Sequence, residues 1–147
     1  MEKVPFVKMC SFARIPSKRR TDDAGYDLFA ANTQIILPYG REAIDTGIAL
    51  TVPMNTYGRI APTSNLSYHS WLNVGGGVID RGYTGSIKVI LFNHSSKPKI
   101  IYRGDKIAQL IFEVIRAIEL VEVSGLKESE RGHAGLNLRG TCASTST

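Results

Sequence analysis

The chain has 147 residues, 43% apolar and 21% charged, and this size and balance predict one ordinary globular domain that buries a core without disulfides or a structural metal. Its net charge of +5 favours an anionic partner, but the cations are scattered rather than interleaved with aromatic residues, so a small polyphosphate fits as well and we expect no direct nucleic-acid binding. Cys10 and Cys142 lie near opposite ends and form no Cys-x-x-Cys or Cys/His cluster, which argues against a disulfide framework and a zinc site.

The N-terminal stretch MEKVPFVKMCSF lacks the long apolar region of a signal peptide, and no apolar run approaches membrane-spanning length. We therefore expect a soluble protein of a reducing intracellular compartment, with no membrane partner. The basic triplet Lys18-Arg19-Arg20 is too short to decide between cytoplasm and nucleus.

Proline and glycine punctuate the chain at short intervals, and the segments between them are rich in β-forming residues. Residues 43–52, AIDTGIALTV, alternate with the period of one half-buried strand. Residues 64–72, SNLSYHSWL, are the only predicted helix, with Ser64 as its N-cap. Residues 86–93, SIKVILFN, and 106–115, KIAQLIFEVI, are nearly continuous apolar runs, as in strands covered on both faces. Many short strands with frequent turns predict an all-β sandwich or barrel.

The composition changes at residue 124. From there on, apolar content falls and glycine, serine, threonine and charged residues dominate, so the segment cannot bury enough surface to order itself alone. We expect a β domain over residues 1–123 and a flexible C-terminal tail over residues 124–147. The arginines and glycines of this tail have two interpretations, terminal disorder or a flap that becomes ordered on an anion.

Residues 75–85, GGGVIDRGYTG, place three consecutive glycines, one carboxylate and a tyrosine inside an otherwise strand-like region. Consecutive glycines lose much backbone entropy on folding and add no side chain to a core. We therefore expect something to approach the backbone closely at this point.

Several candidate residues have an ordinary structural interpretation when taken singly: Ser64 as a helix cap, Asp80 in a turn, Tyr83 as a strand aromatic and Arg131 as a tail residue. Their order in the chain favours a functional interpretation of the whole set. In order and spacing, five segments resemble the five motifs of the trimeric dUTPases, over nearly the whole chain: AGYDL at 24–28, GRIAPTS at 58–64, GGGVIDRGYTG at 75–85, GDKIAQLI at 104–111 and RGHAG at 131–135.

The resemblance implies an all-β fold, a jelly-roll-like β-barrel with one short helix and a flexible C-terminal tail. It also implies a homotrimer with active sites at the subunit interfaces. The implied activity is hydrolysis of dUTP to dUMP and pyrophosphate with Mg²⁺, which limits uracil incorporation into DNA and supplies dUMP for dTMP synthesis.

The glycine-rich hairpin is compatible with this chemistry. Backbone groups of Gly77 and Val78 are expected to pair with the polar edge of uracil, whereas cytosine would leave a buried group unpaired at a cost of about 1–3 kcal/mol. The resemblance places Asp80 at the sugar 3′-hydroxyl and the attacking water, where a carboxylate is a general base. It places the ring of Tyr83 against C2′, where a ribose hydroxyl would have no room.

The resemblance also assigns residues to the triphosphate and its metal. The hydroxyl of Ser64 and the N–H of Asn65, at the predicted helix start, are candidate phosphate donors. Gln109 is a further donor, and Arg131 is expected on the terminal phosphate. Asp27 is expected to hold Mg²⁺ through water. The remaining candidates for contact with the substrate are Thr63, Leu136, Asn137 and Arg139.

Two motifs depart from the family pattern. Thr63 and Asn65 stand where the second motif usually has arginine and glycine, so a phosphate-binding cation is missing. Leu136, Asn137 and Arg139 occupy the region where the fifth motif has an aromatic residue followed by glycine, serine and threonine. Leu136 forfeits base–aromatic stacking worth about 1–3 kcal/mol. Arg139 is the candidate replacement for the missing cation.

Three functions remain open on this sequence. The first is an active dUTPase, because the candidate base Asp80, the glycine-rich hairpin expected to bind uracil, and Tyr83, the sugar gate expected to exclude ribose, are all present. The second is a catalytically weak or inactive protein of the same fold that binds nucleotide or a protein partner, given the changes in the second and fifth motifs. The third, a dCTP deaminase, is disfavoured because that enzyme reads cytosine and arranges its catalytic carboxylate differently.

Overall fold

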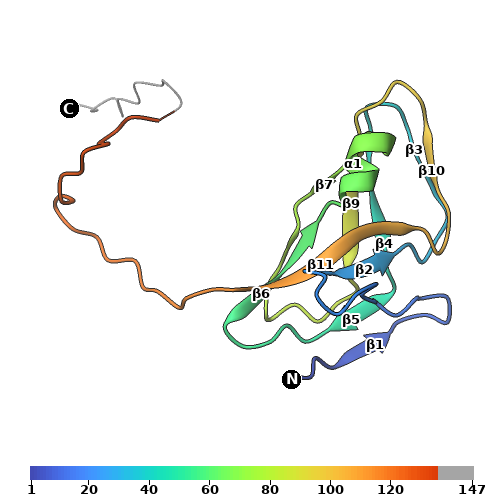
Figure 1. The fold of residues 1–147 in the computed structure, drawn as a ribbon, viewed down its shortest axis with the longest axis horizontal. Helices are drawn as coiled ribbons and strands as arrows, with labels where there is room; N and C mark the ends of the chain where they lie inside the picture. The colour runs from blue at the N-terminus through green and yellow to red at the C-terminus, as the bar shows by residue number, and fades with distance from the viewer. Residues whose placement is uncertain (136–147) are drawn as a thin grey trace, which may run out of the picture. The chain divides into compact units, whose positions relative to one another are not determined.

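The computed structural model of the chain describes residues 1–135, and these form an all-β fold with one short helix, as the sequence predicts (Figure 1). No helix in this part of the chain is long and apolar enough to cross a membrane. The elements follow in this order: β1 (Phe6–Lys8), β2 (Tyr26–Phe29), β3 (Gln34–Ile36), β4 (Arg41–Asp45), β5 (Ile48–Leu50), β6 (Thr56–Ala61), α1 (Ser64–Ser70), β7 (Leu72–Gly75), β8 (Val78–Ile79), β9 (Lys88–Asn93), β10 (Lys99–Ile101) and β11 (Lys106–Val114).

The strands form four antiparallel sheets, ordered β2-β11-β6-β8, β4-β9-β7, β1-β5 and β10-β3. Most paired strands are distant in sequence, such as β2 with β11 and β4 with β9, which is the connectivity of a jelly-roll-like fold. Within residues 1–135 the ladders stay separate and do not join into one closed barrel.

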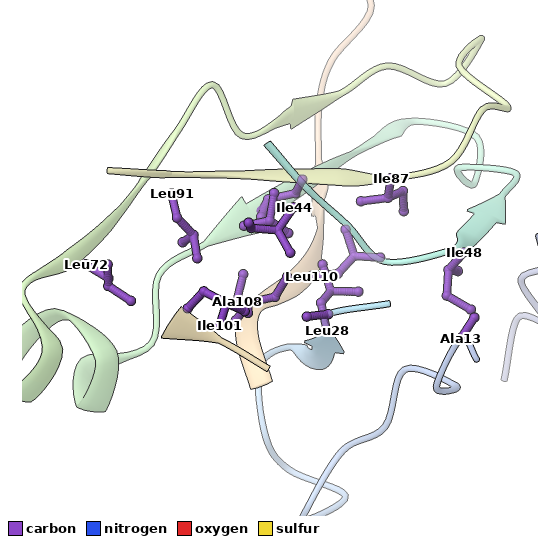
Figure 2. Packing of buried hydrophobic residues seen from close by; sticks show 14 of the residues in the cluster. Ala13, Leu28, Ile44, Ile48, Leu72, Ile87, Leu91, Ile101, Ala108 and Leu110 are labelled. Atoms are coloured by element: carbon purple, nitrogen blue, oxygen red, sulfur yellow. The ribbon is translucent and has the colours of Figure 1, made fainter. Parts of the chain in front are cut away.

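The hydrophobic core is lined by the inner faces of the two larger sheets, and buried residues of β3, β5 and β10 also belong to it. Ile44 and Leu91 of the three-stranded sheet and Leu110 and Leu28 of the four-stranded sheet are almost completely buried. Figure 2 shows Ile44 and Leu91 on the opposite side of this interior from Leu110. Alternate residues of these strands point inward, so the sheets present their other faces outward.

The apolar run at 86–93 is covered fully on only one face within the chain. Val89 and Leu91 are buried, whereas Ile90 and Phe92 are only half-buried. The expectation that both faces of this strand are covered is therefore wrong for the single chain. The core lies against one face, and the other face is covered only in part.

The predicted single strand at 43–52 is two strands, because the chain turns between β4 and β5. Gly47 has φ of 64°, a left-handed conformation that ends the first ladder. Thr46 is fully buried, and its hydroxyl donates to the carbonyl of Ile87 at 2.7 Å. The positions that the alternation placed inside, from Ile44 to Val52 in steps of two, are buried, but Gly47 and Ala49 between them are buried as well. All three residues of β5 are therefore buried, and the expectation of one half-buried strand is wrong for this part of the segment.

The chain divides into two compact units, Met1–Ala117 and Ile118–Thr147. The first unit holds all the strands and the helix named above. The expected boundary between residues 123 and 124 lies slightly further along the chain and stays a prediction.

Candidate functional site

Three strands of the four-stranded sheet bring together candidates from three separate motifs. Asp27 on β2 is the register partner of Gln109 on β11, and Gln109 is in turn the partner of Ala61 on β6. The side-chain amide of Gln109 donates to the carbonyl of Pro62 at 3.1 Å, which ties β11 to the segment that leads into α1. Asp27, Gln109 and the start of α1 therefore share one end of this sheet.

The start of α1 differs from the sequence prediction by one residue. Thr63 has extended backbone angles, and its hydroxyl accepts a hydrogen bond from the N–H of Leu66 at 3.4 Å. Thr63 is therefore the N-cap, and Ser64 is the first helical residue, with its side chain exposed beside that of Asn65. Serine and threonine are both favoured N-cap residues, so the sequence alone did not distinguish these neighbours.

The end of α1 also differs from the prediction, which extended the helix to residue 72. The helix ends at Ser70, because Trp71 adopts a left-handed conformation with φ of 58°. Its N–H donates to the carbonyl of Leu66, which closes the last turn. Leu72 then begins β7.

Asp27 lies next to a cation that the sequence did not suggest. The ammonium group of Lys106 is 3.5 Å from the carboxylate of Asp27, whose side chain is only 25% exposed. The two residues are far apart in sequence and meet only because β2 pairs with β11. Among residues 1–135, no three His, Cys, Asp or Glu side chains cluster in a way that could hold a metal alone.

Packing or backbone conformation within the chain requires glycine at each of the positions 75–77. A Cβ on Gly75 would lie 2.2 Å from a ring carbon of Phe92, so this ring fills the place of a side chain. Gly76 and Gly77 have φ of 66° and 88°, which L-residues rarely adopt. A Cβ on Gly77 would also lie 2.9 Å from the carbonyl oxygen of Ile60. The expected close approach is thus made at least in part by the protein itself.

The carbonyl of Gly77 already takes part in the sheet, because it accepts a hydrogen bond from the N–H of Ile60 at 2.8 Å. A carbonyl oxygen has a second lone pair, so it retains capacity for a ligand. Val78 pairs with Arg59, and its side chain is 62% exposed. The hairpin therefore offers a backbone edge with little side-chain cover.

Asp80 and Tyr83 belong to one tight turn. The N–H of Tyr83 donates to the carbonyl of Asp80 at 3.0 Å. Both side chains are exposed, and the hydroxyl of Tyr83 donates to the carbonyl of Ser86 at 2.7 Å. An exposed carboxylate and an exposed aromatic ring are thus carried by one short turn just after the glycine hairpin.

Within one chain, this turn is separated from the row that contains Asp27. Ile79 pairs with Gly58, so Asp80 lies one residue beyond that level, toward the start of β6. Gln109 pairs with Ala61, which lies about four residues further along β6 than the level of Asp80. At roughly 3.3 Å per residue, the two groups are separated by about 13 Å along β6.

The candidates of the fifth motif contribute little within the described residues. The guanidinium of Arg131 donates to the carbonyl of Ala134 at 2.8 Å, a local contact of the second unit. Leu136, Asn137 and Arg139 lie outside the described residues.

A second group on the same sheet was not expected from the sequence. Glu113 on β11 accepts hydrogen bonds from the hydroxyl of Tyr57 and, at 3.0 Å, from the guanidinium of Arg59, both on β6. The Tyr57 hydrogen bond, and then that of Arg59, lower the pKa of Glu113. The hydrogen bond to Glu113 raises the pKa of Tyr57, and it likewise raises the pKa of Arg59. The pairing of Tyr57 with Glu113 follows from strand register alone.

Comparison with known proteins decides the family. The dUTPase family model matches residues 12–138. The chain belongs to the dUTPase family. It is 42% identical over 143 residues to the deoxyuridine 5′-triphosphate nucleotidohydrolase of Fowlpox virus, a match that covers 95% of this chain and 99% of the viral one. It is 45% identical over 126 residues to the enzyme of the same name from Candida glabrata, with 85% and 88% of the two chains covered.

Solved structures of dUTPases share the fold. The dUTPase of Staphylococcus bacteriophage 80alpha with dUPNHPP superimposes with a TM-score of 0.87 at 25% identity, covering 96% of this chain and 100% of the phage chain. The dUTPase of phage phi11 of S. aureus, whose structure details the coordination of a structural Mg(II) ion, gives a TM-score of 0.81 at 25% identity, with 86% and 100% covered. The jelly-roll-like fold expected from the motifs is thereby confirmed.

Proposed function

We propose that the chain hydrolyses dUTP to dUMP and pyrophosphate. The observation that carries this proposal is the arrangement of residues 75–83 in a member of the dUTPase family. The backbone edge at Gly77 and Val78 leads directly into the turn that bears Asp80 and Tyr83. This stretch offers one kind of group for each part of dUTP: backbone groups for the base, an aromatic ring for the sugar and a carboxylate for the water that attacks the phosphate.

In this proposal Asp80 is the general base. Its carboxylate takes a proton from a water molecule, whose oxygen forms a bond to phosphorus while the bond between the α- and β-phosphates breaks and pyrophosphate leaves. The exposure of Asp80 supports access of water and substrate. Tyr83 contacts C2′ of the sugar and leaves no room for a ribose hydroxyl.

The phosphates are bound by donors around the start of α1. The exposed Ser64 and Asn65 stand at this start, and Gln109 retains one amide hydrogen besides the one that it donates to Pro62. The hydroxyl oxygen of Thr63 accepts from the N–H of Leu66, and its O–H group stays able to donate to a phosphate oxygen. Contacts from Arg131, Leu136, Asn137 and Arg139 stay predictions.

The donor set fits Mg²⁺ that is held mainly by the substrate. Mg²⁺ usually keeps several waters and is bound through one or two carboxylates and the phosphates, and Asp27 supplies one half-buried carboxylate in the same row as Gln109. The ion would neutralise charge on the phosphates as the bond breaks. Lys106 partly compensates the charge of Asp27, so the two cations compete for this carboxylate.

We further propose a homotrimer in which neighbouring subunits complete each site. The separation of about 13 Å along β6 between the level of Asp80 and the row of Gln109 supports a site built from more than one chain. Exposed apolar side chains also support assembly, because a free chain would leave them in water: Ile115, Ile118, Leu120, Val121 and Val123. An intracellular location stays a prediction.

One experiment tests the proposed reaction. The purified chain is incubated with dUTP or dCTP and Mg²⁺, and pyrophosphate and ammonia are measured separately. A dUTPase releases pyrophosphate from dUTP and no ammonia. Ammonia from dCTP would instead identify a deaminase and overturn the proposal.

A second candidate, a protein that binds nucleotide without turning it over, is favoured by the sequence changes in the second motif, at Thr63 and Asn65, and in the fifth motif. It predicts that dUTP raises the melting temperature while no pyrophosphate forms, because a ligand that binds only the folded state stabilises it.

A further inference from the structure

The turn that carries Tyr83 is tied to the core through two side chains with no role in the proposed chemistry. The hydroxyl of Ser86 donates to Oδ1 of Asp45, and the hydroxyl of Tyr83 donates to the carbonyl of Ser86 at 2.7 Å. We propose that Asp45 and Ser86 are positioning residues, which hold the ring of Tyr83 where it excludes ribose. This inference rests on the proposed function, in which Tyr83 contacts C2′ of the sugar.

Asp45 and the backbone next to Ser86 are themselves held by further hydrogen bonds. Oδ1 of Asp45 also accepts a hydrogen bond from the N–H of Gly47 at 2.9 Å, which fixes the carboxylate at the break between β4 and β5. The next residue after Ser86, Ile87, is almost completely buried. Its N–H donates to the carbonyl of Ile48 at 2.8 Å, and its carbonyl accepts from the N–H and the hydroxyl of Thr46. Ser86 is therefore anchored on the core side of the turn.

The ring of Tyr83 has no comparable support from packing. Its side chain is 43% exposed, and it lies against the backbone of Gly85, where a Cβ would be 2.8 Å from the Tyr83 hydroxyl oxygen. Polar contacts rather than core packing set the position of the ring. The N–H of Tyr83 also donates to the backbone carbonyl of Asp80 in the same turn.

Ser86→Ala tests the inference, because it removes the hydroxyl that binds Asp45 and leaves the carbonyl that Tyr83 contacts. The measured quantity is the ratio of kcat/KM for dUTP to kcat/KM for UTP. We expect this ratio to fall by about 2- to 10-fold, the scale of one hydrogen bond. Ser86→Thr retains a hydroxyl and is expected to restore most of the ratio.

Ser95→Ala is the matched control. The hydroxyl of Ser95 also donates to another side chain, Oδ1 of Asn93 at 2.7 Å, but in the loop between β9 and β10. It is expected to lower the melting temperature about as much as Ser86→Ala while leaving the substrate ratio unchanged. If the ratio of kcat/KM for dUTP to that for UTP fell equally in Ser86→Ala and Ser95→Ala, the effect would come from a general loss of stability. That result would overturn the inference.

Tyr83→Ala separates the two ways of failing. If Tyr83→Ala leaves the ratio at the parent value, the proposed sugar gate itself is wrong. If Tyr83→Ala lowers the ratio but Ser86→Ala does not, the role of Tyr83 in excluding ribose is supported and the positioning role of Asp45 and Ser86 is wrong. The inference holds only if both variants narrow the ratio and Ser95→Ala does not.

Discussion

The ammonium group of Lys106 lies 3.5 Å from the carboxylate of Asp27, across the ladder between β11 and β2. A cation at this distance opposes the approach of Mg²⁺ to the same carboxylate. Lys106→Gln should therefore lower the Mg²⁺ concentration for half-maximal pyrophosphate release, by about 1.5- to 5-fold for a partly exposed pair. Lys97→Gln, at an exposed lysine in the loop between β9 and β10, serves as control. A raised Mg²⁺ requirement would show that Lys106 acts on the phosphates instead.

Asp80 is expected to be essential for turnover and dispensable for folding. Its side chain is exposed on a turn, so Asp80→Asn keeps the shape and removes the basicity without disturbing the core. Turnover should fall by roughly 10²- to 10⁴-fold, as for the loss of a general base, with the melting temperature nearly unchanged. Turnover of dUTP at the parent rate would make Asp80 a turn residue only.

Gly85→Ala should push the ring of Tyr83 out of place. A Cβ at Gly85 would lie 2.8 Å from the hydroxyl oxygen and 2.9 Å from Cζ of that ring, and Gly85 is not among the glycines with positive φ, so the conflict is purely steric. We expect a smaller preference for dUTP over UTP. Gly82→Ala is the control in the same turn, because its Cβ would meet nothing within 4 Å. Equal ratios in the two variants would argue against any need for a fixed ring.

The group formed by Glu113, Tyr57 and Arg59 should make stability depend on pH at both extremes. The pKa of Glu113 is lowered from 4.5, so its contribution is present above that value and is lost as the pH falls through the folded-state pKa. The pKa of Tyr57 is raised from 10.0, so its contribution is present below that value and is lost as the pH rises through the folded-state pKa.

Glu113→Gln removes the carboxylate from this group. Melting temperatures measured from about pH 6 down to about pH 3 should fall less steeply for Glu113→Gln than for the parent chain. Parallel curves would mean that the group contributes nothing to acid sensitivity.

Thr63→Arg is expected to have opposite effects on binding and on stability. An arginine here restores the cation that the second motif lacks, so in an Arg139→Ala background it should recover part of a 10- to 150-fold loss in kcat/KM expected for one charge-assisted contact, at about 1.5–3 kcal/mol. It also removes the N-cap hydroxyl that binds the N–H of Leu66, at a cost of about 0.5–2 kcal/mol. Kinetics and thermal unfolding of the single and double variants check both effects. Parent-like kinetics of Arg139→Ala would end the idea of a relocated cation.

The amino-acid sequence alone was enough to predict an all-β fold, one helix and the motif order, because these depend on local patterns. The larger side chains at every second position of 43–52 are buried as the pattern indicates, although Ala49 between them is buried too. Glycine runs mark backbone that a side chain would obstruct. The family followed from five short segments in the right order, and the family model matches residues 12–138.

Only the tertiary structure decided which residues meet. Asp27 and Lys106 come from strands far apart in the chain, and Asp45 at the end of β4 meets Ser86 in the segment before β9. Nothing local in the sequence indicates either contact. The sequence could not choose between Thr63 and Ser64 as N-cap, because the choice depends on where the backbone leaves β6. It could not show that the first glycine of the run is required by packing, because the ring of Phe92 fills the place of a Cβ at Gly75. Long-range contacts depend on the whole arrangement of sheets, which no short segment encodes.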